Sequence, residues 1–216
     1  MRKQLFYIAT AVYVLAAVAF FVIPDAWRNA WICVPTWLLT VACALGRESG
    51  SRVAAIALAA SAVGDVFGGM SMLLPQMGSF AVAQIIYAVL FARNARFAVR
   101  RVVLILFPLL VAGVVSWNAL PNVDGVLKWC IVGYMVVIVA MSMGAVFVAR
   151  KGWWLLAFGA MMFVVSDAII AWNIFVERVP SALNLIMSTY YVAQGFLGLS
   201  ILGGVLTRTD KVSAGV

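Results

Sequence analysis

Eight long apolar segments, separated by short polar or basic stretches, run through this chain. Of its 216 residues 66% are apolar and only 10% are charged, a composition that soluble domains do not have. An apolar segment of about 20 residues crosses a bilayer as a helix. We therefore predict an all-α polytopic membrane protein with eight transmembrane helices in a single domain over residues 1–216. The expected spans are about 5–23, 30–45, 53–74, 78–92, 102–117, 126–148, 153–176 and 182–206.

The basic residues indicate how these spans are oriented, because cytoplasmic loops carry an excess of lysine and arginine. Eight spans put both termini on one side. If that side is cytoplasmic, only Arg28, Lys128 and Arg178 of the 15 basic residues lie on the other side. We therefore expect both termini to be cytoplasmic, in a bacterial inner membrane. The basic residues assigned to the cytoplasmic side are Arg2, Lys3, Arg47, Arg52, Arg93, Arg96, Arg100, Arg101, Arg150, Lys151, Arg208 and Lys211.

The charged residues, histidines and cysteines of the chain limit which partners it can bind and which reactions it can catalyse. The net charge of +8 comes from short basic clusters between apolar runs, which favours lipid headgroups over nucleic acid as partners. The chain has no histidine, and its three cysteines lie in apolar segments without metal-ligand spacing. Zinc hydrolysis and the Ser/His/Asp and Cys/His mechanisms are therefore excluded. We predict no metal and no cofactor, and any chemistry must use carboxylates, amides and hydroxyls.

Two aspartates lie deep within the predicted spans. Asp65 in the third span and Asp167 in the seventh are each the only charged residue of their span. An ionisable residue at such a depth costs about 3 kcal/mol on insertion scales and usually marks a functional site. Both spans run outward from the cytoplasmic side, and Asp65 follows Arg52 by 13 residues while Asp167 follows Trp153 by 14. Both acids thus lie about 20 Å from the inner surface, and we predict that they share one polar cavity.

Polar residues around the two acids are candidates for the same cavity. Ser61 precedes Asp65 by one helical turn, while Gly64 and Gly68 permit another helix to approach. The triplet VAQ occurs at 82–84 and again at 192–194, each time on the span after an acid, which hints at a four-plus-four repeat. The predicted substrate-binding or orienting residues are Ser61, Gln84, Tyr87, Ser166, Asn173, Tyr190, Tyr191 and Gln194.

Three stretches together resemble the YhhN family of eight-span membrane proteins, which includes the lysoplasmalogenases. They are SAVGDVFGG on the third span, VVSDAIIAWNIF on the seventh and STYYVAQGFLGLS on the eighth, and the resemblance extends over about 35–200. It implies an enzyme that hydrolyses the vinyl ether bond of a lysoplasmalogen, a lysophospholipid, to a fatty aldehyde and a glycerophospho-alcohol. The paired acids of the family correspond to Asp65 and Asp167, and its aromatic and amide positions correspond to Tyr190, Tyr191 and Gln194.

The chain departs from the family pattern at two positions. The pattern commonly has a histidine near the position of Gln84 and a lysine directly before the proline of the second span, where this chain has Val34 before Pro35. These departures leave the headgroup of the substrate open. The chain length of the substrate and the oligomeric state are open as well.

The residues themselves also fit this chemistry. Vinyl ether hydrolysis needs a proton donor, an anion that stabilises an oxocarbenium ion, and a positioned water. Two carboxyl groups in different protonation states supply all three, as they do in glycosidases. We assign Asp167 as the proton donor and Asp65 as the base, with Ser166, Asn173 and Gln194 as orienting groups.

Other functions would also use buried acids. A proton-coupled transporter of lipids or small molecules could employ the same pair, although only Gly68 and Gly69 hint at the broken helix that such transporters have at their binding site. An intramembrane aspartyl protease is disfavoured, because Ser166 precedes Asp167 where that class has tyrosine, and Ala62 stands where its GxGD motif begins. In a purely structural protein, loss of the acids would unfold the chain.

Overall fold

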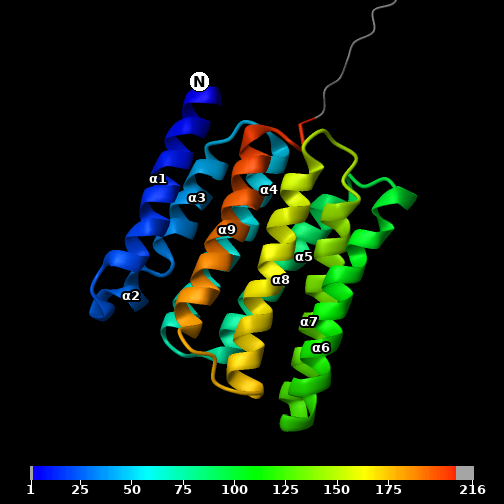
Figure 1. The fold of residues 1–216 in the computed structure, drawn as a ribbon. Helices are drawn as coiled ribbons and strands as arrows, with labels where there is room; N and C mark the ends of the chain where they lie inside the picture. The colour runs from blue at the N-terminus through cyan, green and yellow to red at the C-terminus, as the bar shows by residue number, and fades with distance from the viewer. Residues whose placement is uncertain (1, 208–216) are drawn as a thin grey trace, which may run out of the picture.

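The structure is a computed structural model that describes residues 2–207. Over these residues the chain forms nine α-helices and two short 3-10 helices (Figure 1). Their bounds are α1 Arg2–Val22, α2 Asp25–Trp31, α3 Val34–Ala44, α4 Ser49–Gly69, α5 Leu73–Ala92, η1 Val99–Ile105, α6 Leu106–Ala119, η2 Leu120–Asn122, α7 Gly125–Val146, α8 Trp153–Phe175 and α9 Ala182–Gly203.

The helices confirm an all-α polytopic membrane protein. In the described part of the chain, seven helical segments are long and apolar enough to cross a membrane. They are α1, α4, α5, the continuous segment of η1, α6 and η2, then α7, α8 and α9. Large apolar side chains such as Trp117 (83% exposed) and Val126 (79% exposed) cover the outside of the bundle, as expected of a surface that faces lipid.

The second predicted span, 30–45, differs from the prediction because it is divided. The structure has two shorter helices there, α2 and α3, which meet at Ile32 and Cys33. Pro35 lies in the first turn of α3 and has no N–H group, so it cannot donate to the carbonyl of Trp31 and continue one helix through both segments. The sequence predicted eight spans, and the structure has seven of spanning length plus this divided segment.

The start of α1, the end of α9 and two basic loops lie at one end of the bundle. Figure 1 shows the start of α1 and the end of α9 at the same end. The loops after α5 and α7 also meet there: Arg96 N–H donates to Phe147 O (2.8 Å), and Ala149 N–H donates to Asn94 O (2.8 Å). Arg208 and Lys211, two of the basic residues assigned to the cytoplasmic side, lie outside the described residues.

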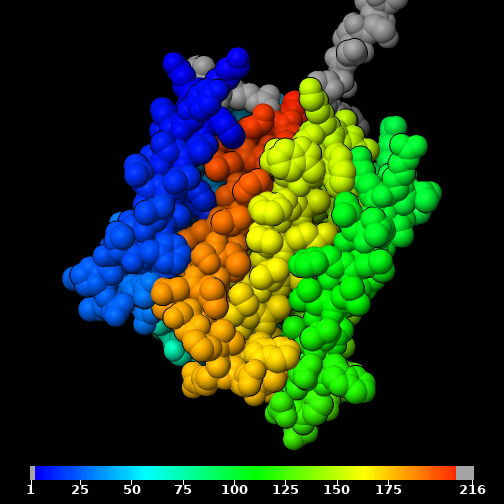
Figure 2. All heavy atoms as spheres, in the orientation of Figure 1, coloured from blue at the N-terminus to red at the C-terminus, as the bar shows by residue number. Residues whose placement is uncertain are grey.

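Helices α8 and α9 lie at the centre of the bundle. In an 18-residue stretch of each helix, 50% of the residues of α8 and 61% of those of α9 are buried, against 22% of those of α1. Helix α9 packs against α1, α3, α4 and α8, and on the face shown in Figure 2 it lies between α1 and α8. Glycines permit this close packing, because a Cβ atom at Gly195 would lie 2.9 Å from the ring of Tyr13, and one at Gly198 would lie 2.6 Å from Leu39.

Candidate functional site

The structure brings the two predicted acids together around one cavity. Asp65 on α4 and Asp167 on α8 are both buried, with 3% and 8% of their surface exposed. Both line a cavity of about 170 Å³. The cavity extends towards the loop between α8 and α9, at the end of the bundle opposite the chain ends. Its other lining residues are Ile32, Gly68, Gln76, Phe80, Ser166, Ile170, Asn173, Ile174, Leu183, Ile186, Met187 and Tyr190.

Asp65 is held by hydroxyl groups from two other helices. The Thr36 hydroxyl on α3 donates to its Oδ2 at 2.8 Å. The Tyr190 hydroxyl on α9 also hydrogen-bonds to this carboxyl group. Gln194, one turn further along α9, donates its amide N–H to the Tyr190 hydroxyl at 3.0 Å. Two hydroxyls and an amide thus fix the position of Asp65.

Asp167 has a separate set of partners. The Tyr134 hydroxyl on α7 donates to its Oδ2. The Gln84 amide on α5 donates to the same oxygen at 3.1 Å and contacts the Tyr134 hydroxyl at 2.8 Å. The two donors converge on one carboxyl oxygen, so the other oxygen, Oδ1, is the one available to a ligand in the cavity.

The two sets of partners follow the same order along the chain. A hydroxyl comes first (Thr36 or Tyr134), then the acid on the next long helix, and then a glutamine on the helix after it. The glutamines are exchanged between the sets, because Gln84 bonds to Asp167 while Gln194 acts on Asp65 through Tyr190. This order is what the repeated VAQ triplet predicts for a four-plus-four repeat.

Two further predicted residues line the cavity without contacting the acids. The Ser166 hydroxyl donates to Ile186 O at 3.2 Å, which links α8 to α9. The Asn173 Oδ1 accepts the N–H of Val179 at 2.9 Å and so holds the loop between these helices. Both residues shape the wall of the cavity next to Asp167.

Three predicted residues lie elsewhere. The hydrogen bond expected from Ser61 to Asp65 is not formed, because the carboxyl group turns to Thr36 on α3 and the Ser61 hydroxyl is buried without a partner. The Tyr87 hydroxyl is likewise buried without a partner, and its ring stacks on Phe91 away from the cavity. Tyr191 lies on the opposite face of α9 from the cavity and donates to Ile32 O at 2.8 Å.

Thr36, Tyr134 and Gln76 were missed by the sequence prediction. Tyr134 is the single tyrosine of the sixth predicted span, which is otherwise mostly apolar, and this position could have marked it. Thr36 lies in the second span, which carries no acid to draw attention to it. Gln76 falls between two predicted spans, but α5 begins earlier than expected and includes it. The Gln76 side chain packs across Gly68, where a Cβ atom would lie 2.7 Å from the Gln76 amide.

A small apolar hollow of about 50 Å³ adjoins the cavity at Asp167. It lies between α5, α7 and α8, and it shares Gln76, Phe80, Asp167 and Ile170 with the cavity. Its remaining lining residues are Leu73, Met77, Ile131, Tyr134, Met135, Ala171 and Phe175. Asp167 therefore borders a polar space on one side and an apolar space on the other.

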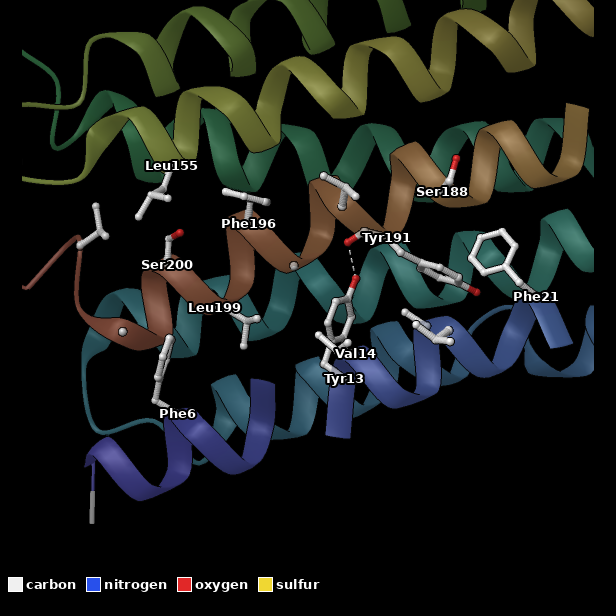
Figure 3. A pocket seen from close by; sticks show the side chains of 16 residues that line it. Phe6, Tyr13, Val14, Phe21, Leu155, Ser188, Tyr191, Phe196, Leu199 and Ser200 are labelled. Carbon is white, nitrogen blue, oxygen red and sulfur yellow. Dashed lines mark hydrogen bonds between the residues drawn. The ribbon is translucent and has the colours of Figure 1, made fainter. Parts of the chain in front are cut away.

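A much larger groove, of about 650 Å³, lies on the other face of α9, between α1 and α8 (Figure 3). Its walls are apolar side chains such as Phe6, Val14 and Leu199. Two hydroxyls at its walls donate to backbone carbonyls: that of Tyr13 to Tyr191 O (2.5 Å), the bond drawn in Figure 3, and that of Ser188 to Leu185 O (2.9 Å). The groove offers no acid or amide to a ligand.

Among the described residues, no group of three or more Asp, Glu, Cys or His side chains could hold a metal ion. The polar side chains that line the cavity carry carboxyl, hydroxyl and amide groups. These groups transfer protons and orient water.

The fold and the cavity define a helical membrane protein with two buried aspartates that line one cavity between its helices. The family model of the YhhN family matches residues 27–201, and the chain belongs to this family. The chain is similar to lysoplasmalogenase TMEM86B of Sus scrofa, with 29% identity over 204 residues that cover 91% of this chain and 84% of that protein.

Two further relatives carry the same activity in their names. Lysoplasmalogenase TMEM86A of Bos taurus is 31% identical over 193 residues, covering 81% of this chain and 78% of that protein. Lysoplasmalogenase TMEM86B of Homo sapiens is 30% identical over 155 residues, covering 71% of this chain and just under two thirds (65%) of that protein. No solved structure matches the chain.

Proposed function

We propose that this protein hydrolyses the vinyl ether bond of a lysoplasmalogen within the membrane and releases a fatty aldehyde and a glycerophospho-alcohol. The observation that carries the proposal is that Asp65 and Asp167, from α4 and α8, line one cavity. The names of the relatives support this choice of substrate, and the carboxyl groups support the chemistry.

The proposed reaction starts with a proton transfer. One carboxyl group donates its proton to the vinyl carbon that is not bonded to oxygen, and the π electrons of the double bond form the new C–H bond. The resulting oxocarbenium ion is stabilised by the second carboxyl group in its ionised form. That carboxylate removes a proton from water as the water oxygen bonds to the cationic carbon. The hemiacetal then breaks its bond to the glycerol oxygen. The second carboxyl group, now protonated, gives its proton to that oxygen, and the first carboxylate takes the proton of the hemiacetal hydroxyl. The aldehyde and the alcohol are released, and both carboxyl groups return to their starting states.

The surroundings of the two acids support Asp167 as the proton donor and Asp65 as the base. The protonated carbon is on the alkyl-chain side of the vinyl ether, and the carbon that water attacks is on the glycerol side. Asp167 borders the apolar hollow, which suits the start of an alkyl chain. Asp65 lies beside the hydroxyls of Thr36 and Tyr190, which suit a water molecule and a glycerol group.

The charge distribution supports the orientation proposed above. We place both termini in the cytoplasm of a bacterial cell, with the protein in the inner membrane. The cavity then extends towards the non-cytoplasmic half of the bilayer. A lysophospholipid already resides in that leaflet, so we propose that it enters sideways from the membrane.

The test measures aldehyde release from a lysoplasmalogen by the purified full chain in detergent. Asp65→Asn and Asp167→Asn should each abolish release while the unfolding temperature stays close to that of the wild type. Asp124→Asn removes an exposed acid before α7 and should leave release unchanged. Full activity in both the Asp65 and the Asp167 variants would refute the proposal.

The break between α2 and α3 favours proton-coupled transport as a second candidate. Discontinuous helices commonly form the substrate sites of transporters, and Ile32, at this break, lines the cavity. In liposomes, proton-driven flux of a lipid or small molecule without aldehyde formation would support transport over hydrolysis.

A further inference from the structure

A positively charged side chain that the proposed chemistry does not use lies close to residues that line the end of the cavity. Arg28 on α2 lies one helical turn before Ile32, which lines the cavity. Its guanidinium group crosses to α9 and donates to the side chain of Asn184. Asn184 follows Leu183, another residue that lines the cavity. The Arg28 side chain therefore bridges two of the segments that enclose this end of the cavity.

The guanidinium of Arg28 is held in place but poorly neutralised. Its Nε donates to Phe20 O at 3.3 Å, and its Cζ lies 4.8 Å from the centre of the Phe20 ring. Only 15% of the side chain is exposed. Its ionic partner, Asp25 at 3.2 Å, is 94% exposed, and such a solvated pair is weak. A largely buried, fixed guanidinium without a buried counter-charge favours an additional anion.

The cavity itself has the opposite character. Its lining includes Asp65 and Asp167 but no lysine or arginine. A phosphate placed between these acids would meet like charge. A phosphate beside Arg28 would meet the two N–H groups that remain on its Nη atoms, since each of the three guanidinium nitrogens already donates one hydrogen bond. Arg28 precedes Thr36, the partner of Asp65, by eight residues across the break between α2 and α3. Eight residues of a straight helix rise about 12 Å, and the bend at the break makes this an upper bound for the gap. The glycerol unit of a lipid together with an arginine side chain can bridge such a gap.

We propose that Arg28 binds the phosphate group of the lysophospholipid and makes the protein selective for ether lipids that carry a phosphate. The proposal rests on the lysoplasmalogen substrate proposed above. The lipid is then arranged with its phosphate at Arg28, its vinyl ether between the two aspartates and the start of its alkyl chain at the hollow beyond Asp167. Arg28 acts in binding and takes no part in proton transfer.

The binding test compares two ether lipids of equal chain length in the same detergent. One is a 1-O-alkyl-glycero-3-phosphocholine and the other is the 1-O-alkylglycerol, which lacks the phosphate; neither has a vinyl bond. The wild-type protein should bind the phosphate-bearing lipid more tightly. Arg28→Gln should weaken that binding by about 10- to 100-fold and leave the affinity for the alkylglycerol unchanged. Arg28→Lys keeps the charge but loses the two Nη groups and should give an intermediate affinity.

Two controls separate this role from a structural one. Arg178→Gln removes an exposed arginine at the same end of the bundle and should change neither affinity. Inorganic phosphate alone should not displace the phosphate-bearing lipid at millimolar concentration; displacement would assign Arg28 to a free anion and overturn the proposal. Equal weakening of both lipids by Arg28→Gln, or equal affinity of the wild type for both, would also overturn it.

The same variants in the hydrolysis assay distinguish this proposal from the proposed function. With 1-O-alkenyl substrates, Arg28→Gln should raise KM for the phosphate-bearing lipid, leave kcat nearly unchanged and leave hydrolysis of the alkenylglycerol intact. If the wild type cleaves neither lipid but still binds in a phosphate-dependent way through Arg28, the hydrolase proposal fails and the phosphate site stands. If it cleaves both equally and binds both equally, the phosphate site fails and the hydrolase stands.

Discussion

The two faces of α9 border spaces of opposite character. On one face, Tyr190 adjoins the cavity of about 170 Å³ that holds both acids. On the other face, Tyr191 adjoins the groove of about 650 Å³ between α1 and α8. The larger space thus has no titratable acid at its walls, and the smaller one has two. The candidate site is therefore assigned by the chemistry of its side chains and not by the size of the space.

The hydrogen bonds explain this difference. In the groove, the hydroxyls of Tyr13, Tyr191 and Ser188 donate to backbone carbonyls, so they are already satisfied. Around the cavity, the hydroxyls of Thr36 and Tyr134 and the amide of Gln84 donate to the carboxyl groups. Changes at the cavity should therefore alter turnover, and changes at the groove should alter only packing. Four variants test this division, in order of decreasing effect.

Tyr134→Phe should have the largest effect. It removes a donor to Asp167 Oδ2 and leaves Gln84 as the only remaining partner of that oxygen. Asp167 becomes charged as it gives up its proton, and hydrogen bonds to charged groups contribute about 1.5–3 kcal/mol. The loss therefore falls on the transition state, and kcat should decrease by about 10- to 100-fold with little change in KM. Tyr87→Phe is the matched control, because its buried hydroxyl has no partner and its loss should not slow turnover. Equal losses in the two variants would contradict the assignment of Tyr134.

Thr36→Val should have a smaller effect on turnover. It removes one donor to Asp65, but the Tyr190 hydroxyl remains beside the carboxyl group. We expect kcat to fall by about 3- to 10-fold. Thr40→Val, one turn further along α3, removes a hydroxyl that bonds only to the Thr36 carbonyl and should leave kcat within about twofold. An unchanged kcat in Thr36→Val would show that this hydrogen bond does not position Asp65.

Gly195→Ala should change stability but not turnover. The new Cβ would lie 2.9 Å from the Tyr13 ring, which cannot move freely because its hydroxyl is bonded to Tyr191 O. Such overpacking costs about 1–3 kcal/mol, measurable as a lower unfolding temperature in detergent. Gly133→Ala is the control, since no atom lies within 4 Å of its new Cβ, and this variant should be as stable as the wild type or slightly more so. A large loss of kcat in a Gly195→Ala variant that remains folded would show that the groove takes part in turnover.

Val14→Trp should have the smallest effect. Val14 lies in the wall of the groove and is 48% exposed, so a larger side chain can occupy the groove without reaching the cavity. We expect turnover to stay within about twofold of the wild type. Ile170→Trp inserts the same side chain between Asp167 and the apolar hollow and should block turnover. A block in Val14→Trp would show that the substrate passes through the groove.

The sequence was sufficient for the overall fold and for the two acids, because both follow from strong local signals. Long apolar runs locate the helices, and a lone charge within such a run identifies Asp65 and Asp167. The partners of the acids were harder to predict, since Thr36 and Tyr134 reach the carboxyl groups only through the packing of α3 and α7. Ser61 lies one helical turn from Asp65, as the sequence shows, but it forms no hydrogen bond with it, because the carboxyl group turns towards Thr36 on α3. The break in the second span was not predicted from the sequence, because it depends on one backbone hydrogen bond that Pro35 cannot donate.

The exchange of glutamines between the two halves of the chain limits how the protein can be divided. A cut in the loop after η2 would leave Asp65 and Gln84 on one fragment and Asp167 and Gln194 on the other. Each fragment would keep its acid and a hydroxyl from its own half but lose the amide that supports that acid. Neither fragment alone could rebuild a complete site, and restoration on mixing would require the two to dock in the original geometry. Reassembly of the fragments can therefore be followed by the return of activity.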